Sequence, residues 1–285
     1  MKIISADRIR NTVADLCLKA NLFLRNDVLT ALKSAYKKEA HRRAKSILSA
    51  IIENAKVARE EKLAICQDTG MPVVFLEVGQ GVKISGDLKS AINRGIESGY
   101  RKGYLRNSII KDPLLRGKSG YQPAVIHTDI AKGDRLRITV LPKGFGCENK
   151  SMLRMFKPTA ELNEIKEFIL EAVKNAGPDA CPPYIVGVGI GGTADYACLL
   201  AKKALLKEIQ NPNTTKSKIN PKSHIQRIER DLLKEINKLN IGPMGLGGET
   251  TALAVNIETY PTHIAGLPVA VNISCHALRS AAAAL

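Results

Sequence analysis

The chain has 285 residues, which suits one large domain or two modest ones, and 45% hydrophobic with 25% charged residues is ordinary for a soluble globular protein. Its formal net charge of +16 has three possible explanations: binding of nucleic acid, binding of an acidic partner subunit, or attraction of small anions into a site. Aromatic residues make up only 4% and Trp is missing, which counts against stacking platforms for single-stranded nucleic acid. Because the basic residues are spread through helical patterns, a solvated surface explains most of the excess and we expect no nucleic-acid partner.

The start of the chain does not read as a signal peptide, since Lys2 and Asp7 place charges there at once. No apolar run approaches the roughly 20 residues that a membrane helix needs. We therefore expect a cytoplasmic protein without a membrane partner, in which cysteines are reduced thiols or metal ligands and not disulfides. No C-x-x-C pair indicates a zinc ribbon or finger. The six cysteines are residues 17, 66, 147, 181, 198 and 275.

Apolar residues at helical spacing predict a series of helices. The second begins at Asn26 or Asp27, either of which can cap it, and continues to about Glu61. It carries a basic cluster at 37–43, which we interpret as a solvated face. The predicted helices cover residues 6–22, 26–61, 88–105, 160–175, 193–209 and 223–239.

Short apolar runs between turn residues predict strands. Residues 132–134 read as a hairpin turn, 111–122 as a loop and 211–223 as an exposed connector. The predicted strands cover residues 73–78, 124–130, 135–141, 184–190, 252–257 and 268–274. Helices and strands do not alternate regularly, as a doubly wound sheet requires. We predict an α+β fold, a single domain over residues 1–285 with mixed helices and short, largely non-doubly-wound sheets.

Residues 187–192 match the pattern G-x-G-x-x-G between a predicted strand and a predicted helix. A dinucleotide-binding turn needs a second parallel strand that ends in an acidic residue about 20 positions later. Here the helix leads into the polar segment 211–223 instead. We therefore interpret these glycines as positions of close backbone packing or as the lining of a site.

Residues 66–70, Cys-Gln-Asp-Thr-Gly, place a soft metal ligand beside groups that can hold and protonate a substrate. Cys66, Cys181 and Cys275 each lie at the edge of a strand-like run, whereas Cys17 and Cys198 lie within helical patterns. Three thiolates brought together by a fold can hold three irons of a [4Fe–4S] cluster and leave the fourth iron open as a Lewis acid. From spacing alone, buried core thiols remain the alternative.

Several long motifs occur in a specific order along the chain. Over nearly its whole length it resembles the α subunit of two-subunit class I (iron–sulfur) fumarate hydratases, a family that includes L(+)-tartrate dehydratase. The motifs that carry the resemblance are CQDTG at 66–70, GCENKS at 146–151, ACPPYIVGVGIGGT at 180–193, GPMGLGGETTALAVNIET at 242–259 and HIAGLPVAVNISCHA at 263–277.

The resemblance implies a cluster site and a dicarboxylate site. Its cluster ligands are Cys66, Cys181 and Cys275, and its dicarboxylate site draws on Gln67, Asp68, Arg106, Gly146 and His263. The chemistry agrees, because the fork of Arg106 suits a carboxylate and Asp68 can move a proton at the oxygen that is added or lost, tuned by the cluster and by His263. Each residue has a simpler alternative. Arg106 could be a surface residue at a helix end, His263 a loop histidine whose hydrogen bonds are satisfied locally, and Asp68 only the cap of a turn.

Two positions depart from the family pattern. Cys147 stands where the family usually has Ser, and Phe145 where Gly is common. A fourth thiolate at Cys147 would close the open iron and abolish Lewis-acid catalysis. We interpret Cys147 as a replacement of Ser that keeps a small polar atom in the substrate turn.

The chain stops soon after the third cysteine motif, at residues 281–285. In the family, further substrate-binding Arg and Lys groups and a Thr base belong to a C-terminal domain. The resemblance therefore implies a separate β subunit and a hetero-oligomer of two or more α/β pairs. Without it we expect the chain to bind the cluster and to turn over substrate poorly.

The motifs together predict a hydro-lyase that interconverts fumarate and (S)-malate, a reaction of the tricarboxylic acid cycle. L(+)-tartrate dehydratase, which forms oxaloacetate, is the alternative within the family. A non-catalytic iron–sulfur sensor is the alternative from another class. A sensor needs all four irons ligated by the protein, so the role of Cys147 discriminates between a sensor and a hydro-lyase.

Overall fold

The computed structural model describes residues 1–209 and 223–285, in two compact units. Unit 1 contains residues 1–25, 55–145 and 279–285, and unit 2 contains residues 26–54 and 146–278. Mixed helices and several small sheets confirm the α+β class. The predicted connector 211–223 lies outside the described residues except for Ser223.

Unit 1 is organised around β2 (Met71–Gly79), a largely buried inner strand of a four-stranded sheet. The sheet order is β12 (Ala281–Ala284), β7 (Leu136–Lys143), β2 and β6 (Val125–Ala131). Helices α1 (Ala6–Leu22) and α4 (Leu88–Lys102) pack on each other and share one hydrophobic core with the sheet. A small parallel pair, β1 (Lys2–Ser5) and β3 (Val82–Ser85), completes the unit.

The predicted hairpin of residues 124–141 is wrong. Both strands form and are connected by the expected turn, but β2 lies between them, parallel to β6 and antiparallel to β7. The run 73–76 is apolar at every position and buried, so it gains more in the middle of the sheet than at an edge.

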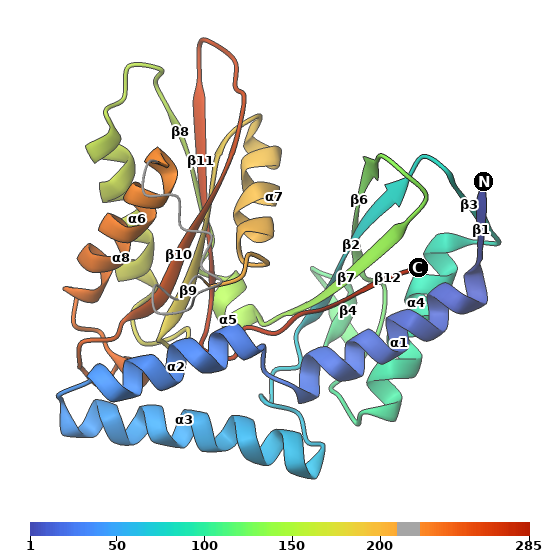
Figure 1. Ribbon diagram of the computed structural model, residues 1–285, viewed down its shortest axis with the longest axis horizontal. Helices are drawn as coiled ribbons and strands as arrows, with labels where there is room; N and C mark the ends of the chain where they lie inside the picture. The colour runs from blue at the N-terminus through green and yellow to red at the C-terminus, as the bar shows by residue number, and fades with distance from the viewer. Residues whose placement is uncertain (210–222) are drawn as a thin grey trace. The chain divides into compact units, whose positions relative to one another are not determined.

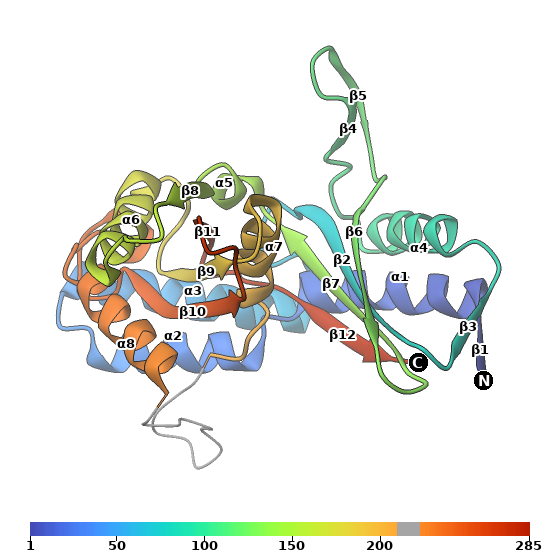
Figure 2. The same ribbon diagram turned by 90° about the horizontal axis from the view of Figure 1, so that it is seen from above.

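Residues 111–122, predicted as a loop, instead contain parts of a two-stranded hairpin. Strands β4 (Ile109–Asp112) and β5 (Arg116–Gly120) pair antiparallel and extend away from the main sheet of unit 1 (Figure 2). The Asp112 carboxylate accepts hydrogen bonds from the backbone N–H groups of Leu114 and Leu115 and closes the turn. Glycine and proline in this segment therefore mark a tight turn and not an irregular loop.

Unit 2 is built on a sheet of order β10 (Ala252–Tyr260), β9 (Tyr184–Gly191), β11 (Leu267–Ser274) and β8 (Met152–Phe156). Strand β10 runs parallel to β9, and β11 antiparallel. Helix α7 (Ala194–Ala204) covers one face, and α6 (Leu162–Ala176) and α8 (His224–Asn237) cover the other (Figure 1). Gly177 ends α6 at a positive φ, as the Gly-Pro stop predicted.

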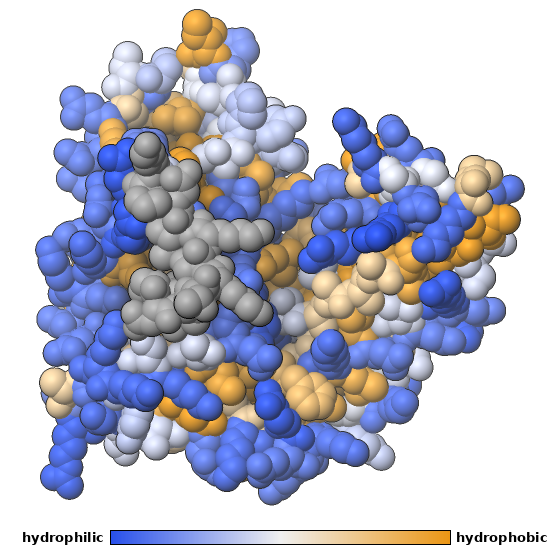
Figure 3. Space-filling model, viewed as in Figure 1, coloured by the Kyte–Doolittle hydropathy of each residue, from blue (hydrophilic) through white to orange (hydrophobic). Residues whose placement is uncertain are grey.

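The predicted helix 26–61 is two helices, α2 (Asn26–Lys38) and α3 (Arg42–Glu61). The break lies at Glu39, whose buried carboxylate accepts hydrogen bonds from the backbone N–H groups of Glu249 and His41. A buried carboxylate needs hydrogen-bond donors, and the break in the helix allows backbone N–H groups to serve as these donors. The cationic residues around the break are exposed, as the solvated-face interpretation predicted; hydrophilic side chains dominate this part of the surface in Figure 3.

None of the helices in the described ranges combines the length and apolarity that crossing a bilayer requires.

Candidate active site

The Cys66–Gly70 turn of unit 1 holds the Asp68 carboxylate by both oxygens. Its Oδ1 accepts a hydrogen bond from the backbone N–H of Gly70 at 2.9 Å, and its Oδ2 accepts one from the N–H of Phe145 at 2.8 Å. The Cys66 thiol is half-buried and lies 3.4 Å from the Gln67 side-chain oxygen. The structure thus places Cys66, Gln67 and Asp68 on one ordered turn with Asp68 in a defined orientation.

Gly70 is required by this geometry. Its φ is +74°, and a Cβ would lie 2.7 Å from the backbone of Pro142 on β7. The buried hydroxyl of Tyr100 on α4 donates to the carbonyl of Thr69 at 2.9 Å. Burial raises the pKa of Tyr100, so this phenol stays neutral and remains a donor. The turn is therefore fixed from the sheet and from α4.

Arg106, the predicted carboxylate ligand, follows α4 and is tied to the same turn. Its backbone N–H donates to Thr69 Oγ1 at 3.0 Å, and its Nη1 lies 3.5 Å from the Gln67 carbonyl. Thr69 is buried, whereas Arg106 is exposed. The guanidinium is thus held near Gln67 and can still reach an anion from solvent.

A cavity of about 380 Å³ in unit 1 opens beside Asp68. Its polar lining is Asp68 together with Ser108 and Arg116, both of which come from the segment that leads into or forms the β4–β5 hairpin. Apolar side chains of Met71 and Phe145 line it as well. A carboxylate, a hydroxyl and a guanidinium thus converge on one pocket of the size used by small ligands.

Sequence reasoning missed Arg116 because it lay in the predicted loop 111–122, and Ser108 because it follows a predicted helix without a motif that marks it. The signal that could have found Arg116 is its position after Asp112, whose turn returns the chain toward the sheet. Arg116 also has φ +65°, an uncommon conformation for a residue with a side chain.

Two of the predicted ligands come together in unit 2. Cys181 precedes β9 and Cys275 follows β11, and these strands pair antiparallel, with Ser274 opposite Ile185. The start of β9 and the end of β11 therefore lie at the same end of the sheet. His276 bridges the two segments, because its Nδ1 lies 3.1 Å from the Cys181 carbonyl. Both thiols are half-buried, and Cys181 has φ +55°.

Cys66 belongs to unit 1, whereas Cys181 and Cys275 belong to unit 2. Over residues 1–209 and 223–285, no set of three or more His, Cys, Asp or Glu side chains is arranged to hold a metal ion. The three-cysteine cluster site therefore stays a prediction. The donor set itself fits an iron–sulfur cluster, since all three are half-buried thiols, none is in a disulfide, and soft thiolates are its usual ligands.

Cys147 occupies a different environment from these three cysteines. It is buried in the main hydrophobic core of unit 2 and its Sγ donates to the carbonyl of Ala180 at 3.3 Å. A hydroxyl could make the same bond, which agrees with the interpretation of Cys147 as a replacement of Ser. The fourth-ligand role that a sensor requires has no support from this packing.

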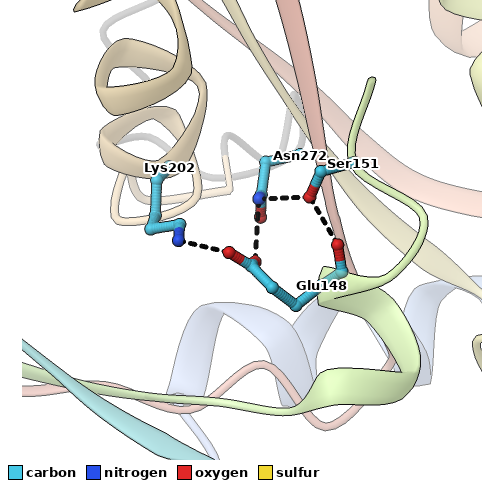
Figure 4. A network of polar contacts seen from close by, with 4 residues as sticks. All are labelled: Glu148, Ser151, Lys202 and Asn272. Atoms are coloured by element: carbon cyan, nitrogen blue, oxygen red, sulfur yellow. Dashed lines mark hydrogen bonds and ion pairs between the residues drawn. The ribbon is translucent and has the colours of Figure 1, made fainter. Parts of the chain in front are cut away.

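The turn with Gly146 is short helix α5 (Phe145–Glu148), and polar contacts anchor its end to the sheet of unit 2 (Figure 4). The Glu148 carboxylate accepts hydrogen bonds from Lys202 Nζ at 2.5 Å and from Asn272 Nδ2 at 2.9 Å. Asn272 also donates to Ser151 Oγ at 2.9 Å. The Glu-Asn-Lys-Ser motif therefore positions the exposed Gly146 backbone, and these contacts explain why its residues are polar.

His263 lies in the loop between β10 and β11, at the other end of the unit 2 sheet from Cys181 and Cys275. The same loop contacts the end of β9, where Thr262 Oγ1 donates to the Gly192 carbonyl at 3.0 Å. The eight residues of β9 separate the two ends by about 25 Å at 3.3 Å per residue. His263 is exposed, with its Nδ1 accepting from the N–H of Ala265.

The glycines that mimic a dinucleotide-binding motif are packing positions. A Cβ at Gly187 would lie 2.2 Å from the Ala201 carbonyl oxygen, and one at Gly189 would lie 2.1 Å from that of Ala197. Both oxygens belong to α7, which therefore lies directly on β9. This confirms the packing interpretation of the motif.

The comparisons with known proteins identify the same family as the motifs. A profile of the family described as "Fumarate hydratase (Fumerase)" matches residues 10–284. A protein of Methanocaldococcus jannaschii, provisionally named L(+)-tartrate dehydratase subunit alpha, is 42% identical over 282 residues, 96% of each chain. The L(+)-tartrate dehydratase subunit alpha of Escherichia coli K12 is 29% identical over 280 residues, 96% of this chain and 90% of that protein. With a match over nearly its full length, the chain belongs to the fumarate hydratase (Fumerase) family.

Proposed function

We propose that the chain is the α subunit of an iron–sulfur hydro-lyase that interconverts fumarate and (S)-malate. The observation that carries the proposal is the 66–70 turn, where Cys66 stands beside a doubly held Asp68 that lines a cavity with Arg116 and Ser108. Family membership supports the reaction class. Dehydration of L(+)-tartrate is the second candidate, because the relatives described above are named for it.

Cys66, Cys181 and Cys275 would hold a [4Fe–4S] cluster, which supplies a Lewis acid for the hydroxyl group that is added or lost. Arg106 and Arg116 bind the carboxylates of the substrate through charge-assisted hydrogen bonds. Asp68 moves a proton at the hydroxyl oxygen from a fixed position, since both of its oxygens are held by backbone N–H groups. Gln67 and the exposed Gly146 backbone contact the remaining oxygens of the dicarboxylate.

A separate β subunit completes the site in this proposal, because the relatives are named as α subunits. The β subunit would contribute the further cationic groups and the base that removes the proton from carbon. The net charge of +16 favours approach of a dianionic substrate. A cytoplasmic location is part of the proposal and agrees with six cysteines that form no disulfide.

His263 can take part only from a second copy of the chain. A separation of about 25 Å along β9 keeps it away from Cys181 and Cys275 of its own chain. The proposed assembly of two or more α/β pairs supplies such a copy.

The decisive experiment is co-expression with a candidate β subunit and anaerobic assay with fumarate, (S)-malate and L(+)-tartrate. We expect cluster absorbance and hydration of fumarate. Cys181→Ser should abolish the cluster and the activity, whereas the matched Cys147→Ser should retain both, because a hydroxyl can replace the buried thiol as a donor to Ala180. Loss of the cluster in Cys147→Ser alone would favour the sensor, and an active complex without a cluster would refute the proposal.

A further inference from the structure

Arg279 is a buried cation in unit 1, and the described residues offer it no carboxylate partner. The residue is 3% exposed, and its Nη2 donates to the backbone carbonyl of Asp68 at 2.6 Å. Its Nε and Nη1 are also buried and have no hydrogen-bond acceptor among the described residues. Buried guanidinium groups are normally paired, because removing the charge from water destabilises the folded chain.

Within the part of the chain that the structure describes, the acceptor bound by Arg279 is a backbone carbonyl of the candidate site. Its hydrogen bond lies on the backbone of the same residue whose side chain is held by Gly70 and Phe145. Tyr100, buried beside the same turn, also interacts electrostatically with Arg279. The turn is therefore held by Arg279 and Tyr100 through its carbonyl groups, while the backbone N–H groups of Gly70 and Phe145 hold the carboxylate of Asp68.

A purely structural clamp would not need a charge at this place. A neutral donor such as a Tyr hydroxyl, already used at Thr69, satisfies a carbonyl without the desolvation of a guanidinium. A cation that destabilises the fold is expected where the function depends on it.

We propose that Arg279 is a positioning residue that fixes the Asp68 peptide and thereby orients Gln67 and Asp68 toward the dicarboxylate. The inference rests on the proposed function. Displacement of a catalytic group by about 1 Å can lower a rate about 100-fold, so the orientation of this turn affects turnover more than it affects binding.

The test uses Arg279→Met in the α/β complex, since Met has a similar length and no charge. We expect kcat to fall by about 100-fold while KM changes less than about threefold, with cluster absorbance retained. The thermal midpoint of unfolding should stay the same or rise, because an unpaired buried charge is removed. Arg279→Lys should recover at least part of kcat, since the ammonium group can still donate to the Asp68 carbonyl.

Arg137→Met is the matched control, because Arg137 lies on β7 of the same unit and pairs with Glu77 at the surface. It should change none of these quantities. A lower unfolding midpoint with a loss of kcat that follows the loss of folded, cluster-loaded complex would show a structural clamp and overturn the proposal. So would an unchanged kcat in Arg279→Met.

Hydrogen exchange of the peptide that covers residues 66–70 separates this inference from the proposed function. Arg279→Met should exchange faster there than wild type, with the rest of unit 1 unchanged, whatever reaction the enzyme catalyses. An inactive wild-type complex would count against the hydro-lyase, whereas unaltered exchange at 66–70 would count against the role of Arg279.

Discussion

Arg116 shows, at the scale of single residues, how a site can recruit a side chain that no motif contains. It lines the cavity with Asp68 and stands at the start of β5 with φ +65°. Its guanidinium is exposed, so it could bind an anionic ligand without the cost of prior burial. Arg116 thus places one cation at a small cavity of unit 1, which suits a substrate that carries a carboxylate.

Arg116→Gln should lower kcat/KM for the dicarboxylate about tenfold, mainly through KM, because a charge-assisted hydrogen bond contributes about 1.5–3 kcal/mol. Steady-state kinetics of the complex measure this. Lys118→Gln on the same hairpin is the control, since Lys118 is exposed and does not line the cavity. Equal effects of the two substitutions would mean that only the overall charge matters.

At the scale of elements, the close contact between β9 and α7 determines how the cysteine segment of unit 2 is held. Gly189 allows the α7 backbone to approach, and the alanines of the helix and β11 fill the rest of that layer. Strand β9 in turn connects the Cys181 segment with the turn at Gly191 and Gly192, both of which have positive φ. A change at this contact therefore affects the whole sheet edge that carries Cys181 and Cys275.

Gly189→Ala should destabilise unit 2 by about 1–3 kcal/mol, because the new methyl group would overlap the Ala197 carbonyl oxygen and force the helix outward. The free energy of unfolding in denaturant measures the change. Gly120→Ala is the control, since a Cβ there meets no atom within 4 Å. If Gly189→Ala were as stable as the control, the packing of α7 on β9 would be looser than described.

At the scale of the whole molecule, the proposed role of His263 would link activity to assembly. Within one chain it lies at the end of the sheet opposite the two ligand cysteines of unit 2. Symmetric oligomers often complete a site with a residue from a second protomer, and a loop as exposed as residues 261–265 is suited to that. Under this proposal the oligomer would be part of the catalytic machinery and not only a means of stability.

Complementation between two inactive variants tests this arrangement. His263→Asn and Cys275→Ser, each expressed alone with the β subunit, should be inactive. Expressed together, they should recover about a quarter of wild-type activity if the complex contains two α chains, because half of the complexes are mixed and each mixed complex has one intact site. The fumarate assay of the whole co-expressed preparation measures it, and tagged purification of the mixed complex should raise the recovered activity to about half of the wild-type value. No recovery would place His263 in the site of its own chain or outside any site.

The sequence by itself determined the family, the hydro-lyase class, the α+β class and most helices, because these depend on motifs and on local apolar spacing. Predictions that needed long-range pairing failed. The order of β6, β2 and β7 depends on which strand gains most from burial, and the break before α3 depends on Glu39 meeting Glu249, 210 residues away.

Only the tertiary structure identified the groups that support the Cys66–Gly70 turn. Arg279 contacts Asp68, which is 211 residues away in the sequence. Arg116 lines the cavity beside Asp68 because it lies in a hairpin that the sequence predicts as a loop. The motif predicts which side chains do chemistry, since their types are local information. Their orientation depends on carbonyl and N–H groups of the turn that are satisfied by distant residues, and hydrogen-bond partners at that separation are set by the fold alone.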